Sequence, residues 1–311
     1  MSDNLVNGLH HVTAIAGSVK NNIRFYTEVL GLRFVKKTIN YDSPETWHLY
    51  YGDETGRPGS AITFFHFKGV PRGRSGNNSM SAVLFSIGEN SIEFWRNRFK
   101  TFQIDYRGPY TRYNEEYLVL EDFDGMPVEL VANSQDGRMG WETPGIPAEN
   151  SIKGFFSAVL SYASFDPTLD FLLRELNHKI LENTGDRVRL FSGENKPGYY
   201  IDLISHPSSP NQMPGTGTVH HLAFQTQDEE SQQQIRKSLV KSGFSPSLVM
   251  DRQYFRSIYF KEPGGVLFEI ATSGPGFLVD ESIENLGSSL KLPHWMENQR
   301  TEIEDLLESI D

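Results

Sequence analysis

The 311-residue chain contains no cysteine, and this absence narrows the chemistry that it can perform. Without cysteine there are no disulfide bonds, no thiolate zinc sites, no iron–sulfur clusters and no thiol nucleophile. Histidine, aspartate and glutamate remain as the usual metal-binding side chains. Any metal site in this protein must therefore be built from imidazole nitrogens and carboxylate oxygens.

The sequence also lacks an excess of positive charge and a long apolar run. It has 29 Lys and Arg against 40 Asp and Glu, a net charge of −11, and its basic residues are scattered, so nucleic acid is not an expected partner. No stretch approaches the roughly 20 apolar residues that cross a bilayer, and residues 1–4 lack the basic start of a signal peptide. We expect a cytoplasmic protein with no membrane partner, and its state as a monomer or homo-oligomer stays open.

What the chain does contain is one βαβββ pattern that recurs four times. In the first copy, Ser18 is placed to cap a helix over residues 19–30, and strand-like runs follow over residues 33–40, 46–51 and 61–67. Later copies begin near Ser81, Ser157 and His221. We expect an α+β fold of four βαβββ units, with modules over residues 1–140 and 151–275. A C-terminal tail over residues 276–311 is expected to be helical from Trp295 to Ile310.

Adjacent histidines open the first and fourth units, as His10-His11 and His220-His221. Because side chains alternate along a strand, the members of each pair are expected on opposite faces, so that one of each pair can bind a metal. His220 shares its face with Leu222, which is typical of a helix-packing face. His11 and His221 are therefore the candidate ligands, and His10 and His220 are expected beside them or toward a substrate.

Glu269 supplies a carboxylate in the closing strand of the fourth unit. Its neighbours are apolar, so an unpaired carboxylate would be costly to bury, and a metal would explain it. A three-residue turn before this strand would place Tyr259 on the same face as a proton donor or acceptor, and Arg252 is a candidate partner for a phenolate or carboxylate. Non-haem Fe(II) oxygenases bind their metal through two imidazoles and one carboxylate and leave other coordination positions open. Zinc, nickel or manganese also bind such a set of ligands.

A simpler interpretation has to be weighed against this one, because a buried histidine is more often a hydrogen-bonded core residue than a metal ligand. Recurrence of the pair in two units, with a carboxylate closing the second, favours the metal. Glu129 occupies the place of Glu269 in the second unit, which lacks imidazoles, and is expected to be a buried, hydrogen-bonded remnant. In the first unit Phe64 is expected at that place, and His48 is a candidate for the cavity wall.

Several motifs resemble the vicinal oxygen chelate superfamily and, within it, the hydroquinone-cleaving ring dioxygenases. The motifs are Gly8–Thr13, Phe25–Arg33, His48–Asp53, His220-His221 and Pro263–Glu269. The resemblance runs from residue 8 to about residue 300 and implies that the units pair into two open mixed-sheet barrels. Units one and four would surround the metal, and units two and three would form a second, empty barrel.

The same resemblance implies Fe(II) as cofactor and O2-dependent cleavage of a hydroquinone such as methylhydroquinone. The expected partners are thus a small aromatic diol and O2. Carried over by position, the metal ligands fall on His11, His221 and Glu269, and the catalytic roles on His10, Thr13, His220, Arg252 and Tyr259. Two alternatives share this fold: a glyoxalase-type isomerase or lyase, which usually has a fourth protein ligand, and a non-catalytic protein that binds an aromatic compound or drug.

Overall fold

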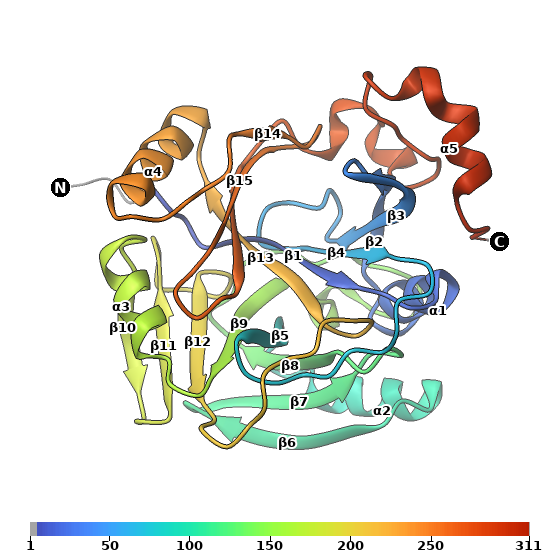
Figure 1. Cartoon of the computed structure of the whole chain (residues 1–311). Helices are drawn as coiled ribbons and strands as arrows, with labels where there is room; N and C mark the ends of the chain where they lie inside the picture. The colour runs from blue at the N-terminus through green and yellow to red at the C-terminus, as the bar shows by residue number, and fades with distance from the viewer. Residues whose placement is uncertain (1–4, 311) are drawn as a thin grey trace.

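The computed structural model describes residues 5–310 and contains two eight-stranded sheets in this part of the chain (Figure 1). The first sheet has the order β14-β15-β16-β13-β1-β4-β3-β2, and the second has the order β10-β11-β12-β9-β5-β8-β7-β6. The strands of the first sheet are β1 (Leu9–Ile15), β2 (Arg33–Asn40), β3 (Ser43–Gly52), β4 (Ala61–His66), β13 (Val219–Thr226), β14 (Met250–Asp251), β15 (Arg256–Lys261) and β16 (Leu267–Thr272). Those of the second are β5 (Ser79–Gly88), β6 (Tyr106–Arg112), β7 (Glu115–Glu121), β8 (Pro127–Asn133), β9 (Gly154–Tyr162), β10 (Lys179–Asn183), β11 (Arg187–Phe191) and β12 (Tyr200–Ser205).

Each sheet joins two units, and the pairing confirms the predicted fold. The first and fourth units meet through antiparallel β1 and β13, and the second and third meet through β5 and β9. Within a unit the first strand runs parallel to the last, as β13 does to β16. Both sheets therefore combine strands from the two halves of the chain, while the module limits 1–140, 151–275 and 276–311 stay predictions. Residues 1–4 and 311 of these ranges lie outside the described residues.

The helices cover the sheets and show their polar sides to solvent. They are α1 (Val19–Ile23), α2 (Ile92–Phe102), α3 (Asp166–Arg174) and α4 (Glu229–Lys241). The helix predicted over residues 19–30 starts as expected, since the Ser18 side chain accepts a hydrogen bond from Asn21 N, but it continues as a π-helical turn, η1 (Arg24–Val29). The wider turn buries both Phe25 and Tyr26 in the core. No described helix is long and apolar enough to cross a membrane.

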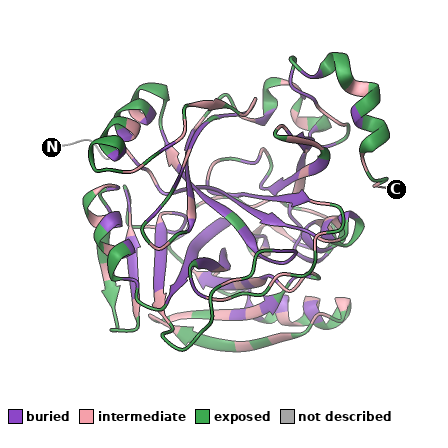
Figure 2. Ribbon diagram, in the orientation of Figure 1, coloured by how far each residue is buried: buried purple, intermediate pink, exposed green. Residues whose placement is uncertain are grey.

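The central strands carry the core, so a site built on them is protected from water. Figure 2 shows the strands at the centre of the molecule as buried, with exposed residues on the outer helices. Every residue of β1 is buried, and β13 is buried at all positions except His220 and Gln225. Side chains that project from β1, β13 and β16 therefore meet in a largely dry environment.

The C-terminal tail is less helical than the single helix predicted from Trp295 to Ile310. It contains short turns, η3 (Phe277–Val279), η4 (Ile283–Asn285) and η5 (Glu297–Gln299), followed by α5 (Arg300–Leu306). Part of its backbone bonds to the first sheet instead: Lys291 N donates to Lys37 O at 2.9 Å, and Trp47 Nε1 donates to Glu308 O at 2.8 Å. The tail accordingly lies beside β2 and β3 (Figure 1).

Candidate metal centre

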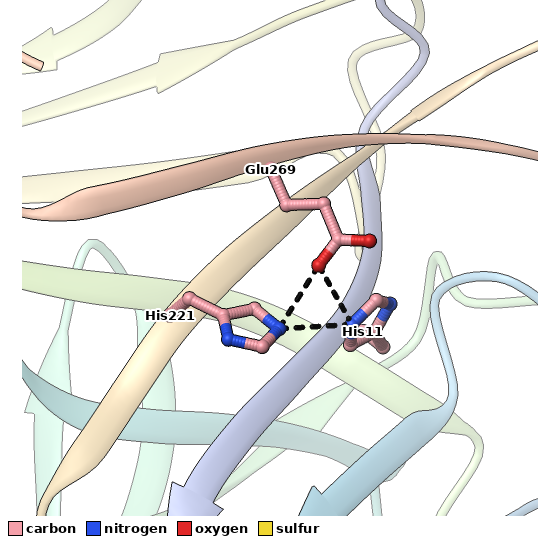
Figure 3. Close-up of side chains that lie close together, drawn as sticks. All are labelled: His11, His221 and Glu269. Atoms are coloured by element: carbon pink, nitrogen blue, oxygen red, sulfur yellow. Dashed lines mark hydrogen bonds and ion pairs between the residues drawn. The ribbon is translucent and has the colours of Figure 1, made fainter. Parts of the chain in front are cut away.

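Three neighbouring strands of the first sheet bring the predicted ligands together. β1 carries His11, β13 carries His221 and β16 carries Glu269, and their ligand atoms all lie within 4.8 Å of one another. Glu269 Oε2 is 3.3 Å from His11 Nε2 and 2.9 Å from His221 Nε2, and the two nitrogens are 3.2 Å apart (Figure 3). The first and last quarters of the chain thus meet at one cluster.

The burial and bonding of Glu269 fit a bound cation. Its side chain is 0% exposed, and one oxygen accepts a hydrogen bond from Ser257 Oγ. The other, Oε2, accepts no hydrogen bond from the residues that the structure describes and faces the two imidazole nitrogens. Burial alone would raise the pKa of this carboxyl, but positive charge on the imidazoles of His11 and His221, at the place that a metal ion would take, lowers it well below its usual range. An ionised oxygen aimed at two imidazoles is a donor set that a divalent metal satisfies.

The expectation that the histidines of each pair point to opposite faces was wrong, because each pair lies at a β-bulge. The pairing of β1 with β13 shifts between Leu9 and His11 on one strand and at His220 on the other. A bulge inserts one extra residue and suspends the alternation of side chains. As a result His10 Nδ1 lies 2.9 Å from His11 Nδ1, and His220 Nδ1 lies 2.8 Å from His221 Nδ1.

His10 determines which nitrogen of His11 carries a proton. His10 Nε2 lies 3.1 Å from Thr272 O, which can only accept, so this nitrogen carries the hydrogen. Burial lowers the pKa of His10 to about 3, so the ring is neutral and its Nδ1 is an acceptor. His11 Nδ1 must then donate, which leaves the lone pair of His11 Nε2 directed at the cluster. This is the tautomer that a metal ligand needs.

His220 takes the same place beside His221 but differs in exposure. His10 is 4% exposed, whereas His220 is exposed and lines a cavity above the cluster. Its Nδ1 is engaged by His221, so Nε2 is the ring nitrogen left for a bound molecule. The two pairs are therefore alike in geometry, but only the second is open to a small molecule.

A cavity of about 360 Å³ opens on the cluster. Its wall includes Tyr259, which pairs directly with Glu269 across β15 and β16, as the turn length predicted. Arg252 Nε donates to the Tyr259 hydroxyl at 3.1 Å, and Arg252 Nη2 bonds Asp42 at 2.9 Å. Burial and the charge of Glu269 raise the pKa of Tyr259 above its ordinary value, so its hydroxyl keeps its proton. The further lining residues are Asn40, Tyr41, His48, Tyr50, Phe65, Met250, Phe255 and Leu267.

The position that matches Glu269 in the first unit is Thr63, so the expectation of Phe64 there was wrong by one residue. Glu269 pairs with the residue two places after His221, and Thr63 pairs with Thr13, two places after His11. Thr63 Oγ1 is bonded to Thr13 Oγ1 at 2.8 Å and to His48 Nε2 at 2.9 Å. Phe64 lies in the hydrophobic core instead. A hydroxyl that is already hydrogen-bonded therefore stands where a carboxylate could have been the fourth ligand.

Sequence reasoning missed several contributors to the site, among them Thr63, Phe255 and Ser257, which donates to Glu269. The Phe255 ring is 4% exposed, and its centre lies 4.9 Å from that of His10 and 5.0 Å from that of His11. Nothing in the local sequence marks this phenylalanine, because it precedes β15 and reaches the histidines only through the fold. The alternating pattern around Thr63 would have identified that position had the register been known.

The second sheet was expected to form a barrel without a metal, and the place that corresponds to the cluster contains charged side chains. Arg189 is 1% exposed, and its guanidinium bonds Asp202 at 2.7 Å and Glu115 at 2.8 Å. Glu129 was expected to be a buried remnant, but its side chain is 13% exposed and bonds Arg112 at 2.5 Å. In the second sheet these three carboxylates are therefore paired with arginines.

Comparison with known proteins agrees with this architecture over nearly the whole chain. The Glyoxalase/Bleomycin resistance protein/Dioxygenase superfamily matches residues 8–130 and 156–270. The "Putative ring-cleaving dioxygenase MhqE" of Bacillus subtilis (strain 168) is 40% identical over 302 residues, covering 96% of this chain and 98% of that protein. The "Chlorohydroquinone/hydroquinone 1,2-dioxygenase" of Sphingobium indicum is 31% identical, covering 96% of this chain and 95% of that protein.

Among solved structures, one described as a "putative dioxygenase from Bacillus subtilis" superposes with a TM-score of 0.94 at 37% identity, covering 98% of each chain. The sequence family, the full-length relatives and the superposition all agree with a fold of paired βαβββ units. The chain belongs to the Glyoxalase/Bleomycin resistance protein/Dioxygenase superfamily.

Proposed function

We propose that this protein is a non-haem Fe(II) dioxygenase that opens the aromatic ring of a hydroquinone such as methylhydroquinone. The observation that carries the proposal is a three-ligand cluster, His11, His221 and Glu269, that faces a cavity and has a threonine where a fourth carboxylate would close it. The names of the full-length relatives support the same reaction class.

Bound by these three residues, Fe(II) would supply the redox chemistry that couples the electron-rich ring to O2. The cavity supplies the remainder of the site. Its volume of about 360 Å³ lies near the lower end of ordinary ligand pockets, which suits a single substituted ring. Phe65 and Phe255 contribute apolar walls, and Arg252 and Tyr259 lie on the wall beside Glu269. This arrangement orients a ring with one hydroxyl toward the cluster and limits access of water.

The polar residues of the cavity wall have different roles in hydrogen bonding, charge stabilisation and proton transfer. Tyr259 keeps its proton and lies beside Arg252, so it donates a hydrogen bond to a substrate oxygen, while Arg252 stabilises the negative charge that develops there. His220 is open to the cavity through Nε2 and is the group through which a proton reaches or leaves the substrate. Thr13 holds Thr63 in place, and His10 holds the tautomer of His11.

An oxygen electrode tests the proposal with protein that has been loaded with Fe(II) under anaerobic conditions. Addition of methylhydroquinone should consume O2, and catechol should be a poorer substrate. Glu269→Gln should abolish uptake, because an amide is a weaker ligand than a carboxylate. Glu129→Gln, the matched change in the second sheet, should leave it intact. Iron-loaded protein that binds the diol but consumes no O2 would contradict the proposal and favour a binding protein.

A further inference from the structure

A buried lysine ties the C-terminal tail to the first sheet. Lys36 lies on edge strand β2 and is 0% exposed, a place where lysine is found only when it is paired. Its Nζ lies 2.6 Å from Asp280 Oδ1 and 2.5 Å from Glu281 Oε2, and it donates to Phe277 O at 3.2 Å. All these partners belong to the tail, which lies beside β2 and β3 in Figure 1.

The segment of the tail that Lys36 holds contacts Tyr254 on several sides. Gly276 N donates to Tyr254 O at 2.8 Å, and the Tyr254 hydroxyl donates to Asp280 Oδ2 at 3.0 Å. The Tyr254 ring centre lies 4.9 Å from that of Phe277, and Lys36 Nζ lies 5.0 Å from the Tyr254 ring. Main chain, hydroxyl and ring of Tyr254 are thus all fixed by the tail or by the lysine that holds it.

The next residue, Phe255, contacts the candidate metal centre. Its ring lies against both His10 and His11, at the centre-to-centre distances of 4.9 and 5.0 Å given above. Because one peptide bond joins Tyr254 to Phe255, a shift of the first moves the second. The tail also reaches the cavity wall directly, since the rings of Phe277 and Tyr50 lie 5.0 Å apart.

We propose that Lys36 is a positioning residue for the candidate metal centre. Its ion pairs with Asp280 and Glu281 hold the tail against Tyr254, and this holds Phe255 against the imidazoles of His10 and His11. The inference rests on the proposed metal site and adds a role for the tail, which supports the orientation of the ligands from outside the barrel. Residues that orient metal ligands typically change metal affinity by roughly 10-fold to 100-fold when they are replaced.

A double-mutant cycle in Co(II) binding tests this coupling, with affinity measured by competition with a chromophoric chelator. Lys36→Met and Phe255→Leu should each weaken Co(II) binding by about 10-fold. The double variant should be little weaker than either single one, because both changes release the same ring. The matched control is Arg300→Met, which breaks ion pairs with Glu297 and Glu304 in the same tail. It should leave Co(II) affinity unchanged.

A second measurement does not need metal. Amide hydrogen exchange of residues 254–256 in metal-free protein should be faster in Lys36→Met than in wild type or Arg300→Met. If Lys36→Met does not fold, Asp280→Asn keeps the Glu281 ion pair and should show the same changes to a smaller extent. Unchanged affinity and exchange, or full additivity of Lys36→Met with Phe255→Leu, would overturn the inference. A wild-type protein that binds no Co(II) would overturn the proposed metal site instead, and the exchange measurement would still test the link between Lys36 and Phe255.

Discussion

The two sheets bury a carboxylate at the same register position but provide for its charge in different ways. Glu269 pairs with Tyr259 in the first sheet, and Asp202 pairs with Arg189 at the matching place in the second. Both carboxylates are 0% exposed. In the second sheet the chain itself supplies the cation, while in the first the imidazoles of His11 and His221 face the carboxylate from neighbouring strands.

The hydrogen bonds show what this difference means for function. Asp202 accepts from Ser157 at 3.2 Å and bonds Arg189 at 2.7 Å and Arg187 at 2.6 Å, so both its oxygens are satisfied. Glu269 leaves Oε2 without a hydrogen bond from any described residue. The buried carboxylate of the second sheet is thus satisfied by the chain itself, whereas the carboxylate of the first sheet keeps one oxygen that can bind a metal.

The largest expected effect is on the stability of the second sheet. Arg189→Met leaves Asp202 and Glu115 without their shared cation and should lower the free energy of unfolding by roughly 3–5 kcal/mol, as expected when one partner of a buried ion pair is removed. Urea unfolding measures this. Arg174→Met, which breaks an exposed pair with Asp170, is the control and should change the value by less than about 0.5 kcal/mol. A similarly small loss for Arg189→Met would remove the contrast between the sheets.

In the first sheet, stability should instead depend on metal. At a free metal concentration about 100-fold above the dissociation constant, Fe(II) should raise the free energy of unfolding by about 2.7 kcal/mol under anaerobic conditions. Glu269→Gln should lose this gain, whereas Glu129→Gln should keep it. Thermal or urea unfolding with and without metal makes the comparison, and a gain that survives in Glu269→Gln would place the metal elsewhere.

Acid should weaken the second sheet through Asp202. Burial raises the pKa of this carboxyl, but Arg189 and Arg187 outweigh burial and lower it to about 2 from a usual 3.8. Because the pKa is lower in the folded state, ionised Asp202 stabilises the fold at pH values above 3.8, and this stabilisation is lost as the pH falls toward 2. The free energy of unfolding should decrease by about 2 kcal/mol over this range. Urea unfolding at pH 5, 4 and 3 should show a shallower decline in Asp202→Asn than in wild type. Equal slopes would contradict the assignment.

The smallest expected effect is a fall in O2 consumption when a fourth carboxylate is added beside the cluster in the first sheet. Thr63→Glu places a carboxylate at the position that matches Glu269 and should occupy a coordination position that substrate or O2 needs. We expect metal affinity to be kept and O2 consumption to fall by about 10-fold, or about 1.4 kcal/mol in activation free energy. Thr63→Gln controls for size and should reduce O2 consumption less. Full activity in Thr63→Glu would show that the open position lies elsewhere.

The sequence was informative where a pattern repeats and limited where a register has to be known. Matching histidine pairs, with Glu269 among apolar residues, predicted that the first and fourth units meet, and the fold confirms that pairing. The error of one residue at Thr63 and the wrong faces for His10 and His220 arise from strand register and bulges, which depend on the partner strand.

Contacts formed by distant parts of the chain could not be predicted either. The helix expected to end at Ile310 stops at Leu306, because the backbone beyond it bonds Trp47 of β3. Arg187 and Arg189, alternating with apolar residues in β11, did carry information about the second sheet, since charged side chains on one face of a strand require partners. That pattern would have predicted a charged interior for the second sheet.

The most direct test of the central claim is the metal content of three proteins after anaerobic loading with Fe(II) and removal of free metal. We predict one iron per chain in wild type, one in Glu129→Gln and none in Glu269→Gln. Such a result would place a metal site in the first sheet and none in the second. Iron retained at one equivalent in Glu269→Gln, or lost in Glu129→Gln, would contradict this account.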